Sequence, residues 1–207
     1  MEKKKFLIGT GNNGKFGEIM EVLRGLPYDF LRPADLGLDC DVEENGQTHE
    51  DNAYKKARHF FNQCGFLTLA EDSGIFVDAL AGELGVKTRR WGAGEKATDL
   101  EWVEYFLDAM KDVPQDLRTA RFVCCAALID DKGEAHFFNG QTEGVITDGL
   151  QAQIKEGLPL SSCFKPAGFE KVYAALTSEE KNSISHRGKA IKAARDFLES
   201  CPGRLLT

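Results

Sequence analysis

Two adjacent carboxylates, Glu71 and Asp72, precede Ser73 and Gly74 and lie between the apolar runs 66–69 and 75–77. Acidic side chains at the end of a buried strand can hold a hard cation through oxygen ligands. Such a cation activates water or neutralises phosphate charge. Asp-Ser-Gly is also ordinary turn chemistry. The stretch alone therefore indicates either a metal or acid–base site, or a polar turn between two strands.

A glycine-rich segment, 9–14, follows the short apolar run 6–8 and precedes apolar residues at helical spacing. A strand, a glycine-rich turn and a helix aim backbone N–H groups at an anion. Thr10 and Asn12 add side-chain donors, and Lys15 adds a positive charge. The segment is not a Walker A loop, because Phe16 follows Lys15 where that motif needs Ser or Thr. It predicts an anion site or a turn without a ligand.

Cations recur in two later segments. His186 and Arg187 lie at or just before the first turn of a predicted C-terminal helix. The helix dipole disfavours cations there, so their position indicates a bound anion or polar ligand. The basic stretch 87–90 precedes Trp91 and is compatible with phosphate or base contact, or with an exposed basic loop.

The composition predicts one domain over residues 1–207, long enough for a sizeable core. The net charge of −7 argues against binding a nucleic-acid polymer. The six cysteines form no C-x-x-C pair, so a zinc site is not expected. Their scatter predicts a cytoplasmic protein with reduced thiols. No signal-peptide core and no run long enough to cross a membrane is present in the sequence.

Alternating strand and helix patterns predict an α/β fold. Strands are expected at 6–8, 66–69, 75–77, 121–129, 135–138 and 141–147. Capping boxes predict helices after Thr48 and Thr98, and a third helix covers 190–198. Lysines 55 and 56 are expected at the surface of the first of these helices, and His136 has no obvious partner.

Several motifs follow one another in a fixed order. They are Thr10-Gly11-Asn12-x-x-Lys15-x-x-Glu18, Glu43-Glu44-x-Gly46-x-Thr48, Asn52-Ala53, Lys56-Ala57, Glu71-Asp72-Ser73-Gly74, Arg118-x-Ala120-Arg121-Phe122, Glu180-Lys181-Asn182 and Ser185-His186-Arg187. Together they resemble the inosine triphosphate pyrophosphatase family, over almost the whole chain. The resemblance implies a long twisted mixed β-sheet flanked by helices, with two lobes, a central cleft and a homodimer.

The resemblance also implies an activity and a set of roles. The family hydrolyses non-standard purine nucleoside triphosphates such as ITP, dITP and XTP to the monophosphate and pyrophosphate with Mg²⁺. By position, Glu44 and Asp72 would hold Mg²⁺, and Asp72 would also act as general base. The substrate contacts would be Thr10, Gly11, Asn12, Lys15, Lys56, Ser73, Lys181, His186 and Arg187.

One segment departs from the family pattern. The base-recognition loop of the family reads G-F-G-Y/W-D-P-x-F, whereas 157–164 carries Leu160 and Ser161 at the Tyr/Trp and Asp positions. Losing a stacking ring removes about 1–3 kcal/mol per base by the value for single strands, and Trp91 is one candidate for a compensating ring. Three alternatives follow: the same chemistry with altered or broad base specificity, a nucleotide-binding protein without turnover, and a structural dimerisation domain. The carboxylates Glu44 and Asp72 argue against the second, and cations near helix starts against the third.

Overall fold

A six-stranded mixed sheet organises the computed structural model, which describes residues 3–94 and 96–200. The strands are β1 (Lys4–Ile8), β2 (Tyr28–Leu31), β3 (Leu67–Val77), β4 (Thr119–Ile129), β5 (Ala135–Ile146) and β6 (Phe164–Pro166). Their order is β2-β1-β3-β4-β5-β6. The β2, β1 and β3 strands are parallel, and β3 through β6 are antiparallel. The predicted α/β class with a mixed sheet is confirmed.

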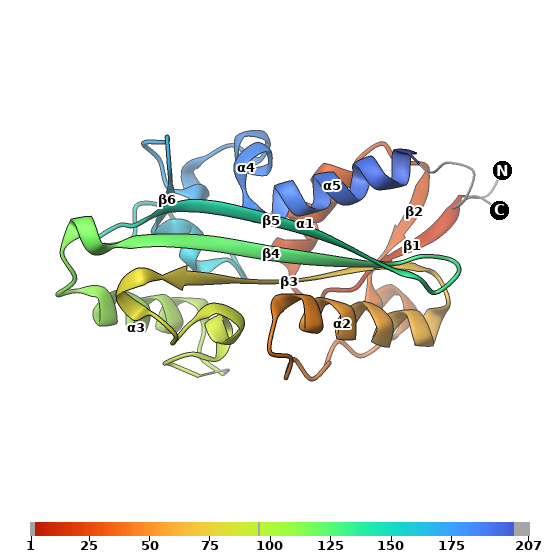
Figure 1. Ribbon diagram of the computed structural model, residues 1–207, viewed down its shortest axis with the longest axis horizontal. Coiled ribbons are helices and arrows are strands. Elements are labelled where there is room, and N and C mark those ends of the chain that lie inside the picture. Colours follow the sequence, from red (N-terminus) through yellow and green to blue (C-terminus); the bar gives the residue numbers. More distant parts are fainter. Residues whose placement is uncertain (1–2, 95, 201–207) are drawn as a thin grey trace.

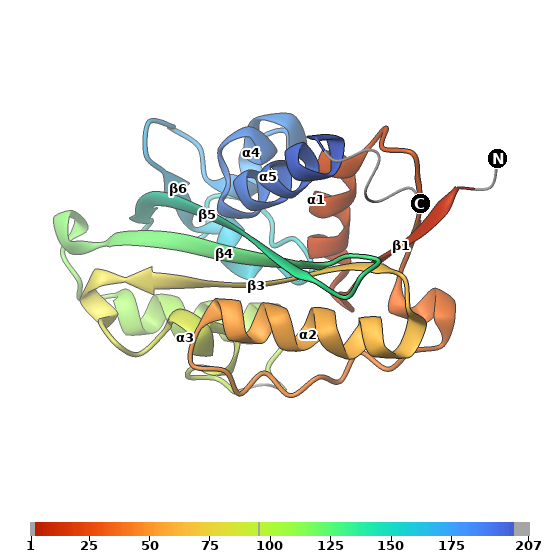
Figure 2. The same cartoon turned by 45° about the vertical axis from the view of Figure 1, so that its right-hand side comes forward.

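Helices flank the sheet in two groups, as Figure 1 shows. They are α1 (Asn13–Leu23), α2 (His49–Cys64), α3 (Asp99–Met110), α4 (Ser178–Ile184) and α5 (His186–Ser200). The strands β3, β4 and β5 run along the length of the molecule and connect two lobes. The α1, α2 and α5 helices lie near β1 and β2, whereas α3 and β6 lie toward the other end of the long strands (Figures 1 and 2).

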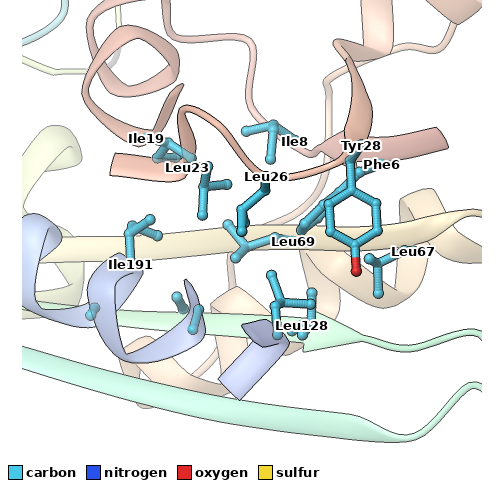
Figure 3. Packing of buried hydrophobic residues seen from close by; sticks show 14 of the residues in the cluster. Phe6, Ile8, Ile19, Leu23, Leu26, Tyr28, Leu67, Leu69, Leu128 and Ile191 are labelled. Atoms are coloured by element: carbon cyan, nitrogen blue, oxygen red, sulfur yellow. The ribbon is translucent and has the colours of Figure 1, made fainter. Parts of the chain in front are cut away.

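Three apolar clusters hold these layers together. In the first, shown in Figure 3, side chains of β1, α1 and α5 converge on Leu69 of β3 and Leu128 of β4. The second joins α3 to the far halves of β3 and β4 through Trp102, Phe106 and Ile75. The third packs α2 against the opposite face of β3 and β4. Burial of these side chains, at roughly 25 cal/mol per Å² of apolar surface, is what fixes the helices on the sheet.

The predicted helix starts are confirmed by their caps. Thr48 accepts from the backbone of Asp51, and Thr98 accepts from that of Glu101, each as part of a reciprocal capping box. In α3, Trp102 is buried and stacks on Phe106 with ring centroids 5.6 Å apart, whereas Leu100 is 49% exposed.

Two predicted breaks in strands are wrong. Segment 71–74 is no turn: it lies inside β3, where Asp72 pairs with Cys125 of β4. Likewise 135–146 is one strand, and Gly140 lies opposite Cys124. A Cβ at Gly140 would come within 2.0 Å of the carbonyl oxygen of His186, so this glycine lets the first turn of α5 lie on the sheet.

Two chain-wide properties complete the description. Within residues 3–94 and 96–200, no helix combines the length and the apolar character needed to cross a bilayer. The five cysteines in that part of the chain are free thiols, and Cys201 lies outside the described residues.

Candidate active site

A cavity of about 850 Å³ opens between the two lobes, and every residue to which the family resemblance assigns a site role lines it, whereas Glu71 does not appear in its described lining. These residues are Thr10, Gly11, Asn12, Lys15, Glu44, Lys56, Asp72, Ser73, Lys181, His186 and Arg187. They come from the β1–α1 loop and the first turn of α1, the loop before α2, α2 itself, the middle of β3, the middle of α4 and the first two residues of α5. Segments far apart in sequence therefore share one cavity. The individual roles stay predictions.

The N-terminal loop is held in place by its own side chains. Asn12 caps α1 by accepting from the backbone N–H of Lys15 (2.9 Å), and its amide donates to the carbonyl of Gly157 (3.1 Å). The backbone N–H of Asn12 donates to Thr10 Oγ (3.1 Å). The cap leaves the positive end of α1 facing the cavity, where an anion is favoured.

The two carboxylates of β3 point to opposite faces, because neighbouring residues of a strand alternate. Glu71 faces α1 and α5, where Lys15 (2.7 Å) and Arg187 (3.6 Å) lie beside it. Burial alone would raise the pKa of Glu71, but Arg187 and Lys15 hold it well below the ordinary range. Arg187 also pairs with Glu18 and donates to Ser73 Oγ (2.9 Å). Glu18 and Glu71 both occur in the family motifs. The sequence offers Glu71 with Asp72 as a metal or acid–base pair, and it assigns no role to Glu18.

Asp72 faces α2, which supplies its hydrogen-bond donors. Its Oδ2 lies 2.7 Å from His49 Nδ1 and 3.3 Å from Asn52 Nδ2, and its Oδ1 lies 3.4 Å from Lys56 Nζ. Burial raises the pKa of Asp72, but the hydrogen bond from His49 and the charge of Lys56 outweigh it and lower the pKa to about 2. Asp72 is therefore ionised at neutral pH.

Lys56 is the exception to the predicted surface position of the two α2 lysines. It is 9% exposed, whereas Lys55 is exposed. Burial alone would lower the pKa of Lys56, but Asp72 and Glu44 (3.1 Å) outweigh burial and raise it. Two carboxylates thus converge on one ammonium group.

This convergence is the arrangement that suits a divalent cation. Carboxylate oxygens are hard ligands, and Mg²⁺ in particular is usually held by one or two carboxylates together with waters and substrate phosphates. In the part of the chain that the structure describes, a group of three metal-binding side chains close together occurs elsewhere, at Asp130, Glu134 and His136 of the β4–β5 turn. The sequence shows no obvious partner for His136, and the structure supplies one, because its Nε2 lies 2.9 Å from Asp130.

The other end of the cavity is largely apolar. Leu158, Pro159 and Leu160 line it together with Trp102 and Phe122. Trp91 packs against Trp102 and donates to Glu83 instead, and it is absent from the described cavity lining. Trp102 on α3 is the ring that the sequence did not single out.

Three polar groups face this apolar end. Lys181 donates to Ser161 Oγ (3.0 Å) and pairs with Glu18, and burial lowers its pKa. His186 stacks on Phe122 with ring centroids 4.6 Å apart, and burial together with Arg187 lowers its pKa well below the ordinary value. It is therefore neutral at physiological pH.

Fold and site together indicate a class of protein. One cleft holds a capped glycine-rich loop, cations fixed by buried carboxylates, and a carboxylate pair, and these groups suit a polyphosphate and a divalent cation. The sequence matches the Ham1 family over residues 6–197, and the chain belongs to this family.

Individual relatives agree with this assignment. A protein from Desulforamulus reducens named dITP/XTP pyrophosphatase is 40% identical over 194 residues, which cover 94% of this chain and 95% of that protein. One from Clostridium perfringens with the same name is 36% identical over 202 residues, 95% of this chain and 98% of that protein. The solved structure of a HAM1 protein from Coxiella burnetii superposes with a TM-score of 0.80 at 32% identity, covering 96% of this chain and all of that one.

Proposed function

We propose that the protein hydrolyses non-standard purine nucleoside triphosphates to the nucleoside monophosphate and pyrophosphate. The observation that carries the proposal is the single cavity in which cations of β1–α1 and α5 meet the carboxylates Glu44 and Asp72. Relatives named dITP/XTP pyrophosphatase over nearly their full length support the substrate class.

The phosphate chain binds, in this proposal, between the N-terminus of α1 and the start of α5. Backbone N–H groups of the glycine-rich loop, Lys15 and Arg187 neutralise the phosphate oxygens. Glu71 and Glu18 hold these cations in position before substrate arrives, so little reorganisation accompanies binding. Such positioning and charge stabilisation supply most of the catalysis in phosphoryl chemistry.

Glu44 and Asp72 would hold Mg²⁺ beside Lys56. The bound ion supplies charge neutralisation on the phosphates and lowers the pKa of coordinated water. Water attacks the α-phosphorus, the bond from that phosphorus to the bridging oxygen breaks, and pyrophosphate leaves. A carboxylate with a pKa of about 2 is a weak base at neutral pH, so orienting the water and binding the metal form the larger part of the role proposed for Asp72.

At the base end, the proposal rests on the donors. Lys181 Nζ offers hydrogen bonds to acceptors, and the ring of Trp102 lines the same end of the cavity. Donors match the oxo groups of hypoxanthine and xanthine better than the amino group of adenine. Leu160 and Ser161 replace the aromatic and acidic residues of the family loop, so this end of the site differs from the family pattern.

The test is product analysis. Purified protein is incubated with Mg²⁺ and a panel of ITP, dITP, XTP, ATP and GTP, and the products are separated by ion-exchange chromatography. Equal amounts of monophosphate and pyrophosphate from the deaminated purines are expected. Tight triphosphate binding without products would instead favour a nucleotide-binding protein.

Two expectations stay predictions: a homodimer, tested by analytical ultracentrifugation, and a cytoplasmic location, tested by cell fractionation.

A further inference from the structure

Asp72 is held asymmetrically, and the asymmetry comes from the first turn of α2. Its Oδ2 lies close to two donors, His49 Nδ1 (2.7 Å) and Asn52 Nδ2 (3.3 Å). Its Oδ1 lies 3.4 Å from Lys56, a long contact on the side of Glu44. The first turn of α2 therefore occupies Oδ2, whereas Oδ1 makes one longer contact with Lys56, farther along the same helix, on the side of the cavity.

Packing against neighbouring residues holds the His49 ring in this position. Its side chain is 11% exposed, and its ring lies edge-on to Phe76, with centroids 6.2 Å apart and planes at 88°. A Cβ at Gly74 would come within 2.8 Å of His49 Cε1, so the glycine of the Asp-Ser-Gly stretch leaves the space that the ring fills. His49 itself does not appear in the described lining of the cavity, so it reaches substrate through Asp72 alone.

The direction of the hydrogen bond follows from the chemistry of the pair. An ionised carboxylate can only accept, so Nδ1 of His49 carries the proton and donates. A carboxylate oxygen that accepts two hydrogen bonds is fixed in rotation about the Cβ–Cγ bond. Hydrogen-bond partners of this kind orient metal-binding carboxylates and are worth about 10–100-fold in metal affinity or activity.

We propose that His49 is a positioning residue that locks Asp72 Oδ2 against α2, so that Oδ1 faces the divalent cation held jointly with Glu44. The inference rests on the proposed function, because it concerns how the same carboxylate is presented to metal and water. Sequence reasoning placed His49 in a capping box and assigned it no role in the site.

The experiment compares His49→Phe with His49→Asn. Phenylalanine keeps a ring against Phe76 but removes the donor, whereas the amide of asparagine can place an N–H near the position of Nδ1. The control is His59→Phe, which removes a histidine later in the same helix, where its Nε2 contacts Gln63 (2.7 Å) and not Asp72. Circular dichroism and thermal unfolding verify that each variant is folded.

Two quantities are measured: the Kd for Mn²⁺ by electron paramagnetic resonance, with and without a non-hydrolysable triphosphate analogue, and kcat and KM at saturating Mg²⁺. We expect His49→Phe to weaken Mn²⁺ binding and lower kcat, each by about 10-fold or more, with KM for the nucleotide within about 3-fold of wild type. His49→Asn recovers most of both losses, and His59→Phe matches wild type.

Two results would overturn the inference. In one, folded His49→Phe keeps the wild-type Kd for Mn²⁺ and the wild-type kcat. In the other, the Phe and Asn variants lose equal amounts of Mn²⁺ affinity and kcat, which would mean that His49 acts through packing and not through its hydrogen bond to Asp72. Because Mn²⁺ binding is measured without turnover, a wild-type protein that binds Mn²⁺ but releases no pyrophosphate would reject the proposed function separately.

Discussion

The two ends of the cavity are built from different chemistry. The phosphate end consists of buried charges that compensate one another, with Glu71 and Arg187 on one face of β3 and Asp72 and Lys56 on the other. The base end consists of apolar side chains on the short turn 159–162 and on α3, with Lys181 as the charged group that contacts this turn.

This difference suggests that the phosphate end of the cavity carries the reaction and that the base end sets the selectivity among bases. Apart from Glu44, which lies in the loop before α2, the charged groups lie on strands and helices, where regular hydrogen bonding fixes their separations. The base end combines Trp102 of α3 with the connecting segment 157–162, where sequence changes are tolerated. In this chain the segment departs from the family pattern while the charged groups match it. Substitutions at the phosphate end should therefore affect all triphosphates alike, and substitutions at the base end should change their ranking.

The largest effect is expected from Asp72→Asn. The amide keeps the shape of the side chain but loses the negative charge that binds the cation and orients water. We expect pyrophosphate release to fall by about 10³-fold for every triphosphate, while circular dichroism stays that of wild type. Release at the wild-type rate would remove Asp72 from the reaction.

Glu71→Gln should act mainly on stability. Removing one partner of a buried ion pair costs about 3–5 kcal/mol, and the lower end applies because Glu18 still pairs with Arg187. Urea unfolding at pH 7 measures this change, and Glu104→Gln on the exposed face of α3 is the control. Equal stability of the two variants would contradict the compensating role of Glu71.

The effect of Glu71→Gln on stability should depend on pH. The pKa of Glu71 is lowered on folding, so below its ordinary value of 4.5 the unfolded chain binds more protons than the folded one. The stability that Glu71 contributes is therefore present above that pH and lost as the pH falls further. The difference in stability between wild type and Glu71→Gln should shrink as the pH drops below 4.5.

Lys15→Ala tests whether the phosphate end of the cavity contributes equally to the hydrolysis of triphosphates with different bases. A charge-assisted hydrogen bond of about 1.5–3 kcal/mol predicts a loss of roughly 10–100-fold in kcat/KM, by a similar factor for ITP, XTP and ATP. Lys55→Ala, which removes an exposed lysine of α2, should leave kcat/KM unchanged. A loss confined to one base would show that Lys15 takes part in base recognition.

The smallest effect is expected from Ser161→Ala. It removes the hydroxyl that accepts from Lys181 (3.0 Å), a hydrogen bond worth about 0.5–1.5 kcal/mol. We expect kcat/KM to change by about 2–10-fold, by different factors for different bases. A uniform change across the triphosphate panel would contradict the assignment of base selectivity to this end of the cavity.

Local sequence determined the parts of the fold that depend on near neighbours. Thr48 and Thr98 fix helix starts because a cap needs residues only three positions apart, and the stripes of α1 and α5 follow from helical periodicity. The residues of the site could be collected from the sequence because the phosphate and metal chemistry demands particular residue types in recognisable motifs.

The tertiary structure decided what depends on distant partners. Segment 71–74 has the composition of a turn, yet pairing with β4 makes it a strand and sends Glu71 and Asp72 to opposite faces. The packing of α2 on β3 buries Lys56, leaves Lys55 exposed and brings His49 to Asp72. These outcomes depend on strand pairing and helix docking between residues far apart in sequence, and a local pattern carries no information about either.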